Sequence, residues 1–217
     1  MTGKPLPIQI NSLHLHLLPE KAVFLPHNET LVIADLHLGK ASHFRKAGII
    51  IPPEAGLKKD YSRLQRLMQS YNPKRLLFLG DLFHSEENTS WLHFLPFIQQ
   101  YPQTAFSLIK GNHDILPSSL YAKAGLRVYE TDLQEDPIIY SHAPLSDLQG
   151  CSLNIAGHIH PGVLLNGLGR QSLRLPCFHY TAQRLILPAF GSLTGLQLLS
   201  KRNARQFVIT DKTVWAI

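Results

Sequence analysis

The segment Arg75-Leu-Leu-Phe-Leu-Gly-Asp81 is a short apolar run that ends abruptly in glycine and aspartate. A run of this length and composition is typical of a buried strand that is followed by a loop. Four further runs have the same form, and they are Leu31–Asp35, Ala105–Asn112, Pro137–His142 and Leu153–His158. The sequence therefore predicts a set of buried strands, each of which ends in polar residues.

Two helices are predicted between these strands. The first begins at Pro52-Pro53-Glu54 and ends before Pro73, and its apolar residues recur at helical spacing as Leu57, Tyr61, Leu64, Leu67 and Met68. The second covers Thr89–Gln100, where Pro96 should kink or end it. Because strands alternate with helices, we expect an α/β fold.

Strand-like segments without intervening helices lie at both ends of the chain. Ile8–Leu17 is expected to form one strand, with Leu13, Leu15 and Leu17 on a single face. The tail contains three more segments, at Arg184–Pro188, Arg205–Thr210 and Val214–Ile217. Strands joined without a helix favour antiparallel pairing, so we expect mixed sheets. No linker or repeat interrupts the sequence, and residues 1–217 are expected to form a single domain.

Composition excludes several classes of protein. The chain has 217 residues, of which 44% are hydrophobic and 17% charged, so disordered and fibrous structures are not expected. It contains no long apolar run, and Lys4, Pro5 and Pro7 stand where a signal peptide would be apolar. We therefore expect a cytoplasmic protein with no membrane partner. Cys151 and Cys177 form no CxxC pair and are expected to be reduced thiols.

The net charge of +6 is unevenly distributed along the chain. Residues 40–75 carry nine basic and two acidic side chains, residues 76–169 three basic and nine acidic, and residues 170–217 seven basic and one acidic. An acidic centre suits divalent cations, and basic flanks suit an anionic polymer or a phosphorylated ligand. The alternative for the basic residues between 58 and 66 is the solvated face of a helix.

Residues that suit metal binding follow the predicted strands, and they are Asp35, His37, Asp81, Asn112, His142, His158 and His160. Loops at the carboxyl ends of strands in an α/β sheet converge on one crevice, so these side chains can meet. Carboxylate, imidazole and amide donors without thiolate suit Mn²⁺, Fe²⁺, Zn²⁺ or Mg²⁺. Seven donors are too many for one zinc and suit two ions about 3.5–4 Å apart that share a carboxylate.

Five ordered motifs carry a family resemblance: Asp35-x-His37, Gly80-Asp81, Gly111-Asn112-His113-Asp114, His142 and Gly157-His158-x-His160. This series, which spans residues 31–160, resembles the calcineurin-like metallophosphoesterases. The longer strings Ala34-Asp-Leu-His-Leu-Gly-Lys40, Phe44-Arg45, Gly48 with Ile51-Pro52, and Gly80-Asp-Leu-Phe-His84 resemble more narrowly the DNA ligase-associated metallophosphoesterases, the PdeM group. The resemblance implies two packed mixed β-sheets flanked by helices, an αββα sandwich.

The resemblance also implies a role for each motif residue. Asp35, His37 and His160 would hold one ion, Asn112, His142 and His158 the other, and Asp81 would bridge them. His113 would lie beside the substrate as a catalytic residue, with Asp114 orienting or polarising its imidazole.

Three further residues are candidate substrate contacts. Lys40 and Arg45 follow the first motif and could bind a phosphate, although a solvated turn would explain them equally well. His84 lies three residues after Asp81 and is either a contact near the site or an ordinary loop histidine.

The function that these features predict is a dimetal-dependent phosphoesterase that hydrolyses phosphodiester bonds by attack of a metal-bound hydroxide. Two divalent ions are expected as cofactors, Mn²⁺ first, with Fe²⁺, Zn²⁺ or Mg²⁺ as alternatives. The resemblance and the basic flanks suggest DNA as the substrate, an endonuclease in DNA repair, and DNA ligase- or helicase-associated proteins as partners. Two alternatives remain: hydrolysis of a small nucleotide or phosphomonoester, and a non-catalytic nucleic-acid-binding module of a repair assembly.

Overall fold

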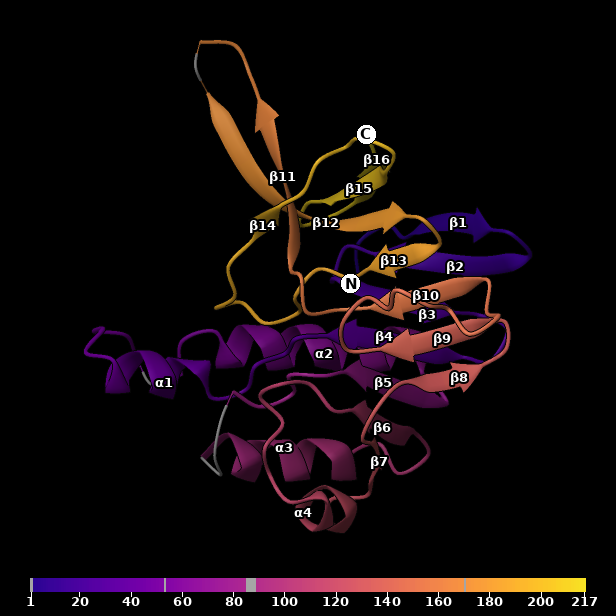
Figure 1. Cartoon of the computed structure of the whole chain (residues 1–217). Helices are drawn as coiled ribbons and strands as arrows, with labels where there is room; N and C mark the ends of the chain where they lie inside the picture. The colour runs from indigo at the N-terminus through magenta and orange to yellow at the C-terminus, as the bar shows by residue number, and fades with distance from the viewer. Residues whose placement is uncertain (1, 53, 85–88, 170) are drawn as a thin grey trace.

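Figure 1 shows the computed structural model of the chain, which describes residues 2–52, 54–84, 89–169 and 171–217. Two β-sheets pack face to face, and helices lie against the outer side of the first sheet. The expected α/β class with two packed mixed sheets is confirmed.

Within the described residues, the first sheet contains seven strands in the order β1 to β7. The strands are β1 (Leu6–Ile10), β2 (Leu13–Leu18), β3 (Ala22–Leu25), β4 (Thr30–Ala34), β5 (Arg75–Leu79), β6 (Ala105–Ile109) and β7 (Leu126–Tyr129). Strands β1 to β4 pair antiparallel, whereas β4 to β7 pair parallel. Because β2 and β4 both run antiparallel to β3, the carboxyl ends of β2, β4, β5 and β6 lie at one edge of this sheet.

The second sheet holds the remaining strands, which are β8 (Leu133–Glu135), β9 (Ile138–Ser141), β10 (Leu153–Ala156), β11 (Pro161–Asn166), β12 (Ser172–Thr181), β13 (Arg184–Ile186), β14 (Gln197–Leu198), β15 (Arg205–Ile209) and β16 (Val214–Ala216). At its centre, β9, β10 and β13 run parallel. The strands β12, β15 and β16 add antiparallel pairs, as the tail of the sequence predicts.

Alternate residues of the central strands face different layers of the molecule. In β4 and β5, Val32 and Leu77 pack between the sheets, in a core that includes Tyr140 and Phe178 of the second sheet. Their neighbours Leu31, Ile33, Leu76 and Phe78 pack against the helices instead. Both faces of these strands are buried, which is why they are apolar throughout rather than alternating.

The helices are α1 (Lys40–Lys46), α2 (Leu57–Tyr71), α3 (Thr89–Gln99) and α4 (Ser118–Lys123). Leu64, Leu67 and Met68 of α2 are buried against the first sheet, as their spacing predicts. Among the described residues, no helix is both long and apolar enough to cross a membrane.

Two expectations about the elements need correction, and a third is confirmed in part. Ile8–Leu17 is not one strand but the hairpin of β1 and β2, because Asn11 turns the chain with a φ of 52°. The first predicted helix begins at Leu57 rather than near Glu54, after Gly56 with a φ of 76°. The second predicted helix is confirmed as α3, which contains Pro96 and continues to Gln99 because Phe94, Phe97 and Ile98 are buried on both sides of the proline; of the two effects expected there, the helix end is not observed and the kink stays a prediction.

Candidate metal centre

The motif residues lie where strands of both sheets end. Asp35 and His37 follow β4, Asp81 follows β5, and residues 111–114 follow β6. In the second sheet, His142 follows β9, and residues 157–160 follow β10. Two hydrogen bonds tie these ends together: His158 N–H donates to Asp35 Oδ2 at 2.9 Å, and Gly157 N–H donates to the His142 carbonyl at 2.8 Å. The packing of the two sheets therefore assembles one site from five strand ends.

The backbone of the site is held in an unfavourable conformation. Five candidate ligands have a positive φ, and they are Asp35 (φ 52°), His37 (49°), Asp81 (49°), His158 (68°) and His160 (53°). Non-glycine residues adopt this region rarely, and strain of this kind concentrates at functional sites.

Asp35, His37 and His160 form the first group of candidate ligands. His160 Nε2 lies 3.5 Å from Asp35 Oδ1, a separation that suits two donors on one cation with bonds of about 2.0–2.2 Å. Among the described residues, Asp35 Oδ1, His37 Nε2 and His160 Nε2 are buried atoms without a hydrogen-bond partner. Buried polar atoms without partners are unfavourable, so three that converge fit a cation.

The second group consists of Asp81, His142 and His158. His142 Nδ1 lies 3.0 Å from the Leu79 carbonyl, to which it can only donate, so Nε2 keeps its lone pair for a cation. This Nε2 lies 3.6 Å from Asp81 Oδ1 and 3.0 Å from His158 Nδ1.

Asp81 faces both groups. Its Oδ1 lies toward His142, whereas its Oδ2 lies 3.6 Å from Nε2 of His37 in the first group. The Asp81 side chain is 5% exposed, and Oδ1 also accepts the N–H of His113 at 2.9 Å. A carboxylate placed in this way can bridge two cations, which is the role expected for it.

Glycine is required where the strand ends meet. A Cβ on Gly157 would lie 2.6 Å from both Ala34 Cβ and Asp35 Oδ2, and one on Gly111 would lie 2.5 Å from Asp81 N. Both distances are well inside van der Waals contact, so a side chain at either position would displace a candidate ligand.

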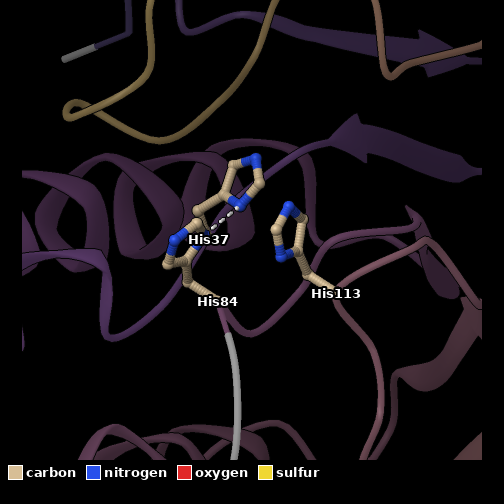
Figure 2. A group of neighbouring side chains, drawn as sticks. All are labelled: His37, His84 and His113. Atoms are coloured by element: carbon tan, nitrogen blue, oxygen red, sulfur yellow. Dashed lines mark hydrogen bonds between the residues drawn. The ribbon is translucent and has the colours of Figure 1, made fainter. Parts of the chain in front are cut away.

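His37 also belongs to a cluster of three neighbouring histidines, with His84 and His113 (Figure 2). His37 Nδ1 lies 3.2 Å from His84 Nδ1, and the His84 ring stacks on His113 with centroids 4.6 Å apart. Burial lowers the pKa of His37 to about 2, and burial followed by the nearby His113 lowers the pKa of His84 to about 4. Both rings are therefore neutral at pH 7, the form in which imidazole binds metals.

Asp114 supports the loop that carries His113. Its Oδ2 accepts the N–H of Gly111 at 2.9 Å, and its Oδ1 accepts those of Leu82 at 3.0 Å and Phe83 at 3.3 Å. Burial raises the pKa of Asp114 to about 6. These contacts hold the β5 and β6 loops together, and thereby position His113 through the backbone.

The remaining predicted residues lie around the site. Lys40 begins α1, where burial lowers its pKa while the Asp81 and Asp35 carboxylates act in the opposite direction, so the ammonium lies within their field. Arg45 is exposed on the same helix. Asn112 lies in the turn between Gly111 and His113 with its side chain exposed, and its role as a ligand stays a prediction.

His43, which the sequence favours as an ordinary surface or core histidine, is a neighbour of the site. The centroid of the His43 ring lies 4.6 Å from that of His84, a member of the histidine cluster. His43 and Lys40 are three residues apart on α1, but the sequence does not predict this helix, so their common face could not be recognised.

Comparisons with known proteins agree with this geometry. The family model described as calcineurin-like phosphoesterase matches residues 29–168. Among solved structures, the nuclease MPE of Pseudomonas putida aligns with a TM-score of 0.81 and 28% identity, covering 99% of this chain and 100% of that one. The phosphoesterase Yfce from E. coli aligns with a TM-score of 0.44 and 12% identity, covering 87% and 97%. No curated protein matches the chain.

Proposed function

The chain belongs to the calcineurin-like phosphoesterase family and is a metal-dependent phosphoesterase, and from this premise we propose that it hydrolyses phosphodiester bonds of DNA. One observation carries the chemistry: Asp35, His37 and His160 converge with unpartnered buried donor atoms on one side of Asp81, and His142 and His158 converge on the other. The donor set lacks thiolates and suits Mn²⁺, which we propose as the cofactor.

Two divalent ions held there would lower the pKa of a water molecule and withdraw charge from the phosphoryl oxygens during in-line displacement. The protein positions these ions with side chains that other contacts already orient. The Leu79 carbonyl fixes the tautomer of His142, and the N–H of His158 fixes one oxygen of Asp35. Such preorganisation avoids reorganisation of the site during the reaction.

His113 is the candidate general acid. Its backbone N–H donates to Asp81 Oδ1, and its ring centroid lies 5.4 Å from that of His37, a candidate ligand of the first group. The proton on the imidazole can pass to the oxygen that departs when the P–O bond breaks, which typically contributes about 10²- to 10⁴-fold in rate. Lys40 lies within the field of the Asp81 and Asp35 carboxylates and therefore close to the candidate metal centre. Its ammonium group can attract a phosphate oxygen of a substrate bound there.

DNA is favoured over a small substrate by two observations. The nuclease that aligns with 99% of this chain acts on nucleic acid by its name, and residues 40–75 carry a net charge of +7 next to the acidic centre. We extend the proposal to a role in DNA repair, with DNA ligase- or helicase-associated proteins as partners, and co-purification with such proteins tests that extension.

A panel of substrates tests the proposed reaction. The Mn²⁺-loaded protein would be assayed with bis-p-nitrophenyl phosphate, p-nitrophenyl phosphate, a cyclic nucleotide, and single-stranded, duplex and nicked DNA. We expect turnover of diesters and of DNA, with little turnover of the monoester. Preference for the monoester would instead favour a small-molecule phosphatase, and DNA binding without turnover would favour a binding module.

Two variants show whether the measured turnover comes from the metal centre or from a contaminating enzyme. Asp81→Asn removes charge from the carboxylate that faces both ligand groups and should abolish turnover of every substrate in the panel. Asp147→Asn makes the same change in an exposed loop, where Oδ1 accepts the local N–H of Gln149, and should retain full activity. Equal activity of the two variants would refute the assignment.

A further inference from the structure

A second hollow lies at the same sheet edge as the metal centre. It has a volume of about 530 Å³ and is bounded by the β2–β3 turn, by α2 and by the β15–β16 turn. Strands β2 and β4 run in the same direction with β3 between them, so the β2–β3 turn and Asp35 lie at one edge. Two strand spacings separate them, which is about 10 Å.

Basic side chains from two elements surround this hollow. Lys59, Arg63 and Arg66 follow one another at helical spacing along one face of α2, and Lys21 comes from the β2–β3 turn. Arg63 is buried and donates to the Phe190 carbonyl at 2.5 Å, so it is not part of a solvated helix face. Lys21 Nζ likewise donates to the Ala189 carbonyl at 2.9 Å. Lys59 and Arg66 are exposed and line the hollow.

The acidic groups around the hollow offset only part of this positive charge, because three carboxylates stand against four cations. Asp60 pairs with Arg63 at 3.7 Å, and Glu20 accepts the N–H of Gly3 at 2.8 Å, while Asp211 lines the opposite wall. Burial, followed by repulsion from Arg63 and Lys59, lowers the pKa of Lys21 to about 8 even though Asp60 acts in the opposite direction. Arg63 and Lys59 therefore both act against the charge on Lys21, and an anion in the hollow would offset that effect.

One segment of chain links the hollow to the metal centre. Lys21 and Arg63 hold the carbonyls of Ala189 and Phe190, and the next residue, Gly191, donates its N–H to the backbone carbonyl of Asp35 at 3.0 Å. Residues 189–191 thus connect the two buried cations of the hollow to the backbone of Asp35, which places the hollow within reach of a strand bound at the metal centre.

We propose that this hollow binds a backbone phosphate of the substrate strand, a few nucleotides away from the bond at the metal centre. Lys59 and Arg66 contact the phosphate, and Lys21 and Arg63 supply fixed positive charge behind them. This inference rests on the proposed action on nucleic acid. A free phosphate compound presents the same chemistry, and the experiment distinguishes the two sources.

The test compares two double variants that remove the same charge. Lys59→Ala/Arg66→Ala removes the exposed cations of the hollow. Lys58→Ala/Lys74→Ala removes two surface lysines that pair elsewhere, Lys58 with Glu54 at 2.7 Å and Lys74 with Glu29. Affinity for a labelled single-stranded oligonucleotide would be measured without metal over a range of salt concentrations, and thermal unfolding would verify that both variants fold.

We expect the first variant to lose two phosphate contacts. Each contact to a single strand contributes about 0.7 to the slope of log affinity against log salt, so the slope should become shallower by about 1.4. At 0.1 M salt this corresponds to roughly 25-fold weaker binding. The control should lose less than about threefold. Equal losses in the two variants would mean a general electrostatic effect and would overturn the proposal.

Two further measurements identify the source of the phosphate. A dinucleotide is too short to reach both the metal centre and the hollow. Its affinity should therefore not fall in the Lys59→Ala/Arg66→Ala variant, whereas that of the long strand should. The affinity for inorganic pyrophosphate would be measured in the same variants. If Lys59→Ala/Arg66→Ala weakens the binding of pyrophosphate but not that of the oligonucleotide, the nucleic-acid assignment is wrong. Turnover of bis-p-nitrophenyl phosphate depends on the metal centre alone, so its absence would refute the proposed function and leave the binding result to decide on the hollow.

Discussion

Replacement of Gly157 by alanine offers a stringent test of how the two sheets assemble the metal centre. The new Cβ would lie 2.6 Å from Ala34 Cβ, whereas carbon atoms in contact normally lie about 3.5–4.0 Å apart. Ala34 is 1% exposed and Asp35 is fully buried, so neither has room to move aside. The end of β4 or the loop after β10 must therefore shift by about 1 Å.

The shift should reduce both stability and metal binding. Overpacking of this kind typically costs about 1–3 kcal/mol, which for a chain of this length lowers Tm by roughly 2–12 °C. Asp35 Oδ2 lies equally close to the new Cβ and also accepts the N–H of His158, so the Asp35 ligand should be displaced. The Mn²⁺-dependent rise in Tm should then be smaller than in the parent protein.

Thermal unfolding with and without Mn²⁺, together with metal analysis, measures both effects. Gly195→Ala is the matched control, because a Cβ there meets nothing within 4 Å and its φ is not positive. The control should keep its Tm within about 2 °C and its metal response. If Gly157→Ala behaves in the same way as the control, the strand ends do not meet as described, and the reasoning fails.

Three shorter predictions address the chemistry and the charge. Asp81→Asn should greatly reduce the Mn²⁺ retained after dialysis, because the residue faces both ligand groups; elemental analysis that finds parent-like metal content would contradict this. His113→Ala should keep the metals but lose about 10²- to 10⁴-fold turnover on substrates with poor leaving groups, and less on activated aryl esters; equal losses would remove it from the acid role. Lys21 has a pKa of about 8 when folded and an ordinary pKa of 10.5. Since the unfolded chain then binds the proton more strongly, the free energy of unfolding should gain about 1–3 kcal/mol from this group as the pH rises from 8 to 10.5, and denaturant titrations of Lys21→Met should lack that gain.

Much of the fold follows from patterns that are local in the sequence. The apolar runs that end at Asp35 and Asp81 are strands β4 and β5, because residues buried on both faces leave no polar position between them. The helical spacing of Leu64, Leu67 and Met68 likewise indicates the face of α2 that packs on the sheet. Where the pattern is continuous, it misleads: the alternation across Ile8–Leu17 hides the turn at Asn11, although asparagine is a common turn residue.

The sequence by itself determines which donor types follow the strands, and thereby the class of chemistry, because strand ends and metal donors are both visible in the order of residues. The tertiary structure alone decides which donors meet. The contact between His158 and Asp35 joins residues 123 positions apart in different sheets, and it depends on how the apolar faces of those sheets pack. The contact between the rings of His43 and His84 likewise depends on tertiary structure. So does the hydrogen bond from buried Arg63 to the Phe190 carbonyl, which places the basic face of α2 along the charged hollow. Periodicity encodes which side of an element is buried, but not what it is buried against.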